Sequence, residues 1–167
     1  MGGRLTLALV AVLVVLAVGA YVAFSPPEPE VAPNAPVMWQ VERDDIVGFQ
    51  ITRRGHPAQA FVRRDGRWQM EPDGGSVPSG SAEGVVLILA APSAKRRLPA
   101  SDDFGLDNPV LTVRVDLAGA PPLMVRVGDP TPASAADYVR VGDQDAVFIV
   151  PSAWRRALVA FSEGLPP

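Results

Sequence analysis

The chain has 167 residues, a formal net charge of −3 at pH 7 and a hydrophobic fraction of 48%. The acidic balance argues against a dedicated nucleic-acid binder, which would need a basic surface. The sequence has no cysteine, which excludes disulfides, thiolate metal sites and cysteine nucleophiles.

The first element in chain order is an apolar run at residues 5–24, LTLALVAVLVVLAVGAYVAF, which has no charge and no Pro. At about 1.5 Å per residue, a helix of this length crosses the roughly 30 Å hydrocarbon core of a membrane. Arg4 precedes the run and Glu28 follows it, so the positive-inside rule places residues 1–4 in the cytoplasm. We therefore predict a single-pass transmembrane helix in the cytoplasmic (inner) membrane, with the rest of the chain in the periplasm or another extracytoplasmic space.

A cleaved signal peptide is the alternative interpretation, with the small residues 18–20, VGA, as the cleavage site. The apolar run continues past this point to Phe24, which is longer than the usual core of a signal peptide. We therefore favour a retained anchor. Tyr21 and Phe24 would then lie at the outer interface, where aromatic rings are favoured.

Residues 25–36, SPPEPEVAPNAP, are rich in Pro. Proline lacks a backbone donor and restricts the residue before it, so this segment cannot form a helix or a central strand. We predict an extended linker that holds the domain at 37–167 away from the membrane.

The first part of this domain has the pattern of a strand meander. The alternation of apolar residues predicts strands at 37–41, 46–52, 58–63 and 67–71. Asp65 and Gly66 are a strong signal for a two-residue hairpin turn. A loop rich in Gly, Pro and Ser follows at 72–80.

A largely apolar stretch at 82–91 predicts a helix that is well buried against the sheet. Ser79 or Ser81 would cap its start, and Pro92 would end it. The stretch is too short to cross a bilayer.

The second part of the domain repeats this order. The pattern predicts strands at 95–98, 110–117, 123–127, 138–141 and 146–150. A helix at 153–161 follows, with Leu158 and either Phe161 or Trp154 on its buried stripe. The predicted fold class is therefore α+β: one N-terminal transmembrane helix, then a mainly antiparallel β domain of two strand meanders, each followed by a helix.

Three motifs of the domain resemble those of a known family. Residues 65–72, DGRWQMEP, resemble a DG-x-W motif, and residues 104–109, FGLDNP, resemble a YGLD-x-P motif with Phe104 in place of Tyr. Residues 127–132, VGDPTP, resemble a G-x-x-T-P motif that precedes two short strands. With the apolar run at the amino end, this order is similar to that of the bacterial family called domain of unknown function 4340, over nearly all of the chain from Ile46 on.

The resemblance implies a membrane-anchored envelope protein, sometimes associated with ABC-type transport and gliding-motility components. It implies no catalytic residues. The chain is short and has one copy of the unit, which leaves room for use as a subunit of another complex.

Candidate contacts with a partner or with the membrane are aromatic or basic. They are Trp39, Tyr21, Phe24, Arg53, Arg54, Arg155 and Arg156. Adjacent Arg pairs recur along the chain, and several of them on one side of the domain would bind anionic lipid heads or an acidic protein. The alternatives are scattered solubilising charge for the Arg pairs and core packing for the Trp residues.

No residue pattern indicates a metal or a catalytic site. His56, the only His, lies in a predicted turn without an acidic or Ser neighbour in sequence. The acidic residues within 102–107 lack the late Glu of a calcium loop. They are better explained by a turn in which Asp107 or Asn108 bonds its own backbone and Gly105 takes a positive φ. We therefore expect no cofactor, no metal and no enzymatic activity.

These features lead to two hypotheses. The first is a non-catalytic accessory or assembly subunit of a larger membrane complex, of the transport, electron-transfer or photosynthetic type, with other membrane-protein subunits and the membrane as partners and no nucleic acid. The alternative is an envelope domain that binds a ligand or glycan in a groove between the two meanders. An enzyme would need a cleft with His56 or an Asp pair of perturbed acidity.

Overall fold

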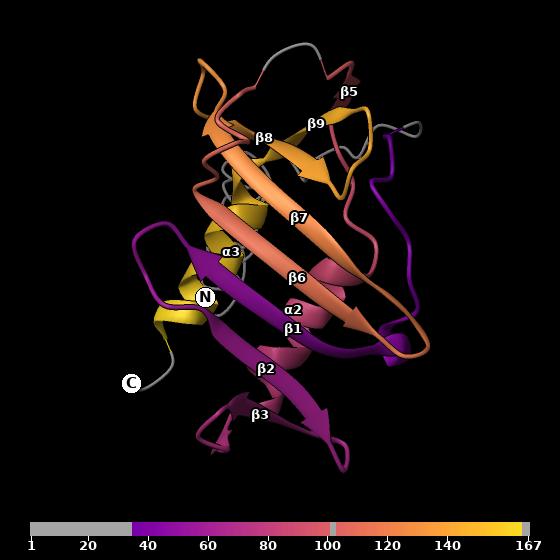
Figure 1. Cartoon of the computed structure of the whole chain (residues 1–167), viewed down its shortest axis with the longest axis vertical. Helices are drawn as coiled ribbons and strands as arrows, with labels where there is room; N and C mark the ends of the chain where they lie inside the picture. The colour runs from indigo at the N-terminus through magenta and orange to yellow at the C-terminus, as the bar shows by residue number, and fades with distance from the viewer. Residues whose placement is uncertain (1–34, 101–102, 165–167) are drawn as a thin grey trace, which may run out of the picture. The chain divides into compact units, whose positions relative to one another are not determined.

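An antiparallel sheet of nine strands organises the residues that the structure describes, which are 35–100 and 103–164 (Figure 1). This computed structural model has the strand order β4-β3-β2-β1-β6-β7-β8-β9-β5. The strands are β1 (Ile46–Arg53), β2 (Gln59–Arg64), β3 (Arg67–Glu71), β4 (Gly75–Ser76), β5 (Arg96–Leu98), β6 (Leu111–Leu117), β7 (Ala120–Pro130), β8 (Ala136–Val141) and β9 (Val147–Pro151).

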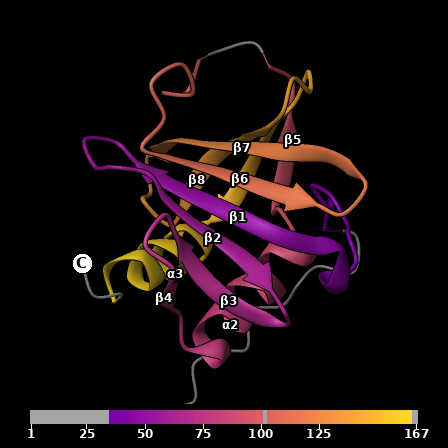
Figure 2. The same cartoon turned by 60° about the horizontal axis from the view of Figure 1, so that its bottom comes forward.

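Two α-helices, α2 (Ser79–Ala90) and α3 (Ser152–Glu163), pack against one face of this sheet within the described part of the chain (Figures 1 and 2). A short 3-10 helix, η1 (Arg43–Asp45), precedes β1. We call the side of the sheet under α2 and α3 the covered face. The opposite side, which carries Gln50, Arg114, Arg126 and Arg140, is the open face.

The predicted fold class needs correction. The two meanders are not separate units, because β1 pairs with β6 and joins them into one sheet. No helix in residues 35–100 and 103–164 is long and apolar enough to cross a membrane. The predicted transmembrane helix at 5–24 lies outside the described residues, as do 1–4 and most of the predicted linker. The α+β character and the mainly antiparallel strands are confirmed.

The covered face holds the core. Its strands contribute Phe49, Ile51, Phe61, Trp68, Val113, Val115, Val125, Val127, Val139, Val141, Phe148 and Val150. The helices add Val86, Leu89 and Leu158 from the other side. Each inward residue alternates with an outward one, because successive side chains of a strand point to opposite faces.

A register shift in β1 changes the alternation that the sequence predicts. The pairing with β6 moves by one residue between Ile46 and Gly48. Ile46 and Phe49 are therefore both buried, although they are three residues apart. Such bulges let a strand direct an extra side chain into the core.

Several predicted boundaries need correction. Residues 37–41 are not a strand, since Val37 makes only an isolated bridge with Ser93. Strand β4 lies in the predicted loop at 72–80. Helix α2 starts at Ser79 with Pro78 at its N-cap, so the predicted serine cap is absent.

Candidate functional site

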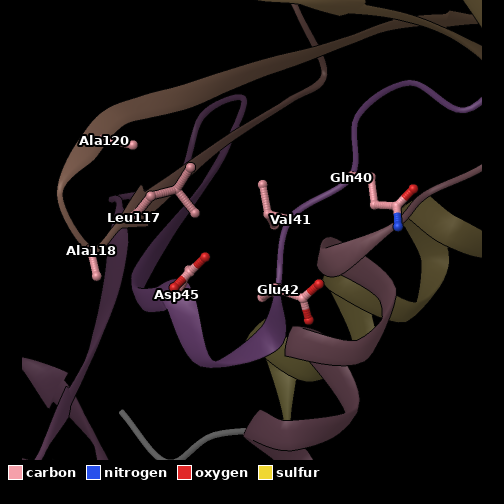
Figure 3. Close-up of a pocket in the computed structure, with 7 residues that line it drawn as sticks. All are labelled: Gln40, Val41, Glu42, Asp45, Leu117, Ala118 and Ala120. Atoms are coloured by element: carbon pink, nitrogen blue, oxygen red, sulfur yellow. The ribbon is translucent and has the colours of Figure 1, made fainter.

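One hollow lies where the segment before β1 meets the turn between β6 and β7 (Figure 3). Its volume is about 440 Å³, and it is lined by Gln40, Val41, Glu42, Asp45, Leu117, Ala118 and Ala120. Val41 and Leu117 lie on opposite sides of it, and the carboxylates of Glu42 and Asp45 lie at its lower edge (Figure 3). The backbone N–H of Ala118 donates to the carbonyl of Asp45 at 2.7 Å, which ties the two walls together.

This hollow has the size of a small-ligand pocket, but its polar side chains are on the rim. Gln40, Glu42 and Asp45 are all exposed, and none of them converges with a His or a basic side chain in the lining. Among residues 35–100 and 103–164, no three His, Asp or Glu side chains are grouped to hold a metal. The lining can accept hydrogen bonds from a hydroxyl or ammonium group against an apolar wall.

The carboxyl end of α2 is closed by two tryptophans. Trp39 Nε1 donates to the carbonyl of Leu89 at 2.7 Å, and Trp154 Nε1 donates to that of Ile88 at 3.1 Å. The next carbonyl, that of Ala90, accepts from the backbone N–H of Val41 at 2.9 Å. The last four carbonyls of a helix have no partner within it, so these donors fix the end of α2 in place.

Trp39 is therefore buried inside the domain and not presented to a partner or a membrane. Only 9% of its surface is exposed, and its ring packs edge-to-face on Trp154 with 6.4 Å between centroids. The sequence could not indicate this role, because the acceptor lies 50 residues further on in the chain. Tyr21 and Phe24 lie outside the described residues.

The four candidate arginines of the described chain do not form one patch. Arg53 pairs with Glu163 at 2.5 Å, and Arg155 pairs with the buried Asp137 at 3.0 Å. The side chain of Arg54 donates to the carbonyls of Asn108 and Pro109. Arg156 is exposed.

His56 is also exposed, in the turn between β1 and β2. Its backbone N–H donates to the carbonyl of Arg53 at 3.0 Å. The structure thus brings no acidic or nucleophilic side chain into a hydrogen bond with its ring within the described residues.

The solvent side of α2 carries small and polar residues and one exposed leucine. Among the described side chains and glycines of this helix, the exposed ones are Gly80, Ser81, Glu83, Gly84 and Leu87. Leu87 is 60% exposed, and Val37, which bridges to Ser93 just after the helix, is 53% exposed. The predicted burial of this helix is therefore true of one side only.

The second and third sequence motifs meet on the open face. The backbone N–H of Asp129 donates to the carbonyl of Phe104 at 2.8 Å. The Phe104 ring stacks on Tyr138 with 4.3 Å between centroids. A Cβ on Gly128 would overlap the Phe104 carbonyl oxygen, so only Gly allows this approach.

The acidic residues beside this contact shape a turn. The carboxylate of Asp103 accepts from the backbone N–H of Gly105 at 3.0 Å and from that of Asp107 at 2.8 Å. Gly105 has φ 74°, as predicted. The turn-forming side chain is Asp103, however, and not the predicted Asp107 or Asn108.

The fold and this motif contact define an α+β domain built on a single antiparallel sheet. Residues 87–162 match the model of the family described as a domain of unknown function (DUF4340). This confirms the family that the motifs predicted, although the match starts well after Ile46 and leaves out the first motif. No curated protein and no solved structure matches the chain.

Proposed function

We propose that the chain is a non-catalytic accessory or assembly subunit of a larger membrane complex, and that its α+β domain binds another subunit through the solvent side of α2. The complex would be of the transport, electron-transfer or photosynthetic type. The observation that carries the proposal is the exposed Leu87 among small residues on a helix that faces solvent.

This side of α2 suits a helix of a partner protein. Gly80 and Gly84 lie one turn apart, and a Cβ added at either of them would meet no atom within 4 Å, so a second backbone can approach closely. Burying a leucine that is otherwise exposed is worth about 1.5–3 kcal/mol. The charged residue on this side, Glu83, also accepts from Trp68 Nε1 at 3.2 Å and is partly engaged with the sheet.

The membrane part of the proposal rests on the sequence. The uncharged run at 5–24 and the Pro-rich segment after it favour a location at the outer side of the cytoplasmic membrane. Fractionation of cells that express the full chain measures this location directly.

A ligand- or glycan-binding envelope domain is the second candidate. It is supported by the hollow between residues 40–45 and the β6–β7 turn, whose size fits a small ligand. Its polar groups lie on the rim and do not converge at depth, which is why we place it second.

Affinity purification of the full chain in mild detergent, with mass spectrometry of the proteins that accompany it, tests the first candidate. We expect stoichiometric recovery of membrane-protein subunits with the wild type and their loss with Leu87→Glu. The matched control is Ala133→Glu, which adds the same charge at an exposed site in the loop before β8. Equal recovery with Leu87→Glu would remove α2 from the interface, and a lone monomer in every case would refute the assembly role.

A further inference from the structure

Two arginines stand side by side on the open face. Arg126 on β7 and Arg140 on β8 are direct partners in the strand register. Their neighbours Val125, Val127 and Val139 belong to the core, so both guanidinium groups project away from the helices. Like charges directly opposite on two strands repel each other, so this pair costs stability unless an anion lies between or above them.

These two half-buried residues line a hollow of about 370 Å³. Ala100 and the β8–β9 turn line it as well, and Asp143, Gln144 and Asp145 of that turn are exposed. Among the described residues, the buried Arg140 Nε has no hydrogen-bond partner, and no carboxylate forms an ion pair with either arginine. An unpaired buried donor is costly, so it marks a place where a ligand would gain free energy.

Arg114 lies on the same face but has an ion-pair partner within the domain. It lies on β6 and pairs with Asp116 at 2.7 Å. Within the described part of the chain, the open face therefore pairs Arg114 with a carboxylate and pairs neither Arg126 nor Arg140 with one.

We propose that Arg126 and Arg140 bind the carboxylate of an Asp or Glu side chain from a protein partner, in a segment where Lys or Arg flanks that acid. Guanidinium groups offer parallel N–H donors that match the two oxygens of a carboxylate. Asp143 and Asp145, which are exposed on the turn that lines the hollow, attract flanking cations and repel further anions. A strongly anionic peptide or an anionic membrane surface therefore fits this charge pattern less well than a single acid between bases.

This site goes beyond the contact proposed for α2, because it lies on the other face of the sheet. The proposed contact on α2 and the proposed carboxylate site can each be disproved without the other. A partner held at both faces would clamp the domain from two sides, and each contact is testable on its own.

The test follows the Nε–Hε NMR signals of the arginines in the full chain in detergent. The probes are three blocked tripeptides: Lys-Glu-Lys, Lys-Gln-Lys and Glu-Glu-Glu. We expect Lys-Glu-Lys to shift the signals of Arg126 and Arg140 and to bind about tenfold more tightly than Lys-Gln-Lys, since a charge-assisted pair is lost in the second peptide. This comparison uses the wild type alone, so it does not depend on how a variant folds.

Variants then assign the binding to these residues. Arg126→Gln and Arg140→Gln are each expected to weaken Lys-Glu-Lys binding about tenfold, whereas Arg114→Gln, the matched control, leaves it unchanged. The double variant Asp143→Asn with Asp145→Asn is expected to raise Glu-Glu-Glu binding to the level of Lys-Glu-Lys. Equal binding of all three peptides, or a preference for inorganic phosphate or for vesicles of anionic lipid over Lys-Glu-Lys, would overturn the proposal.

Discussion

The two faces of the sheet are built from the same strands but stabilised by different forces. On the covered face, Phe49, Phe61 and Trp68 pack with ring centroids about 5 Å apart, and the helices close over them. On the open face, charged side chains alternate with the core residues, and one loop is held down by backbone contacts. The covered face supplies most of the stability, since burial of large apolar side chains outweighs surface charge pairs. The open face is therefore freer to serve recognition.

The largest loss of stability is expected from a substitution on the covered face. Trp68→Ala removes a side chain that is 2% exposed and packs on Phe49, and it also removes the donor to Glu83. We expect a loss of about 3–5 kcal/mol in the free energy of unfolding, measured by urea denaturation. Arg67→Ala, at the adjacent exposed position of β3, is the control and should stay within about 0.5 kcal/mol. Similar losses for both variants would mean that the cost of a substitution in β3 does not depend on which face of the sheet its side chain occupies.

The next prediction tests the close approach of Gly128 to the Phe104 carbonyl on the open face. Gly128→Ala places a methyl group against the carbonyl of Phe104, and the β7 backbone or the loop has to move. We expect a loss of about 1–3 kcal/mol in the free energy of unfolding, measured in the same way. Gly84→Ala is the matched control, because α2 has open space at that position. For this control we expect the free energy of unfolding to rise by up to about 1 kcal/mol, because Ala has a higher helix propensity than Gly.

A third prediction concerns the ion pair at the start of α3. Arg155→Ala leaves the carboxylate of Asp137, which is only 2% exposed, without its partner. We expect a loss of about 1–3 kcal/mol in the free energy of unfolding. Adding Asp137→Asn should recover part of it, because the buried charge is removed as well. A double variant as unstable as the sum of the two single ones would show that the pair is not coupled.

The smallest loss of stability is expected when an ion pair that faces solvent is removed. Glu163 is more than half exposed where it pairs with Arg53, so Glu163→Gln should cost no more than about 1 kcal/mol at low salt. The difference from the wild type should shrink as salt is added, because exposed pairs are screened. A loss that equals that of Arg155→Ala would contradict the distinction between buried and exposed pairs.

The local alternation of apolar and polar residues was enough to predict most strands. It did not predict which strands pair or in which register. The alternation in Val113 and Val115 and the Asp65–Gly66 turn identify their elements, because each depends on neighbours in sequence. The pairing of β1 with β6 and of β5 with β9 depends on partners far along the chain. For this reason the single sheet was not predicted.

The same limit applies to the candidate sites. The sequence leaves Trp39 open between core packing and a contact with a partner or the membrane, and its acceptor on α2 decides between them. Arg126 and Arg140 are ordinary strand residues in the sequence, and only the β7–β8 register places them side by side. The helix that carries Leu87 was predicted, but all of it was expected to be buried, and Leu87 is 60% exposed.

The sheet ends on strands of only two and three residues, Gly75–Ser76 and Arg96–Leu98. A long outer strand with unpaired N–H and C=O groups is a template on which another chain can add and begin to polymerise. Among the described residues, the two outermost strands are too short to present such a template, and Arg96 and Arg97 add charge at one end. We therefore expect many copies crowded together to resist stacking edge to edge into fibres.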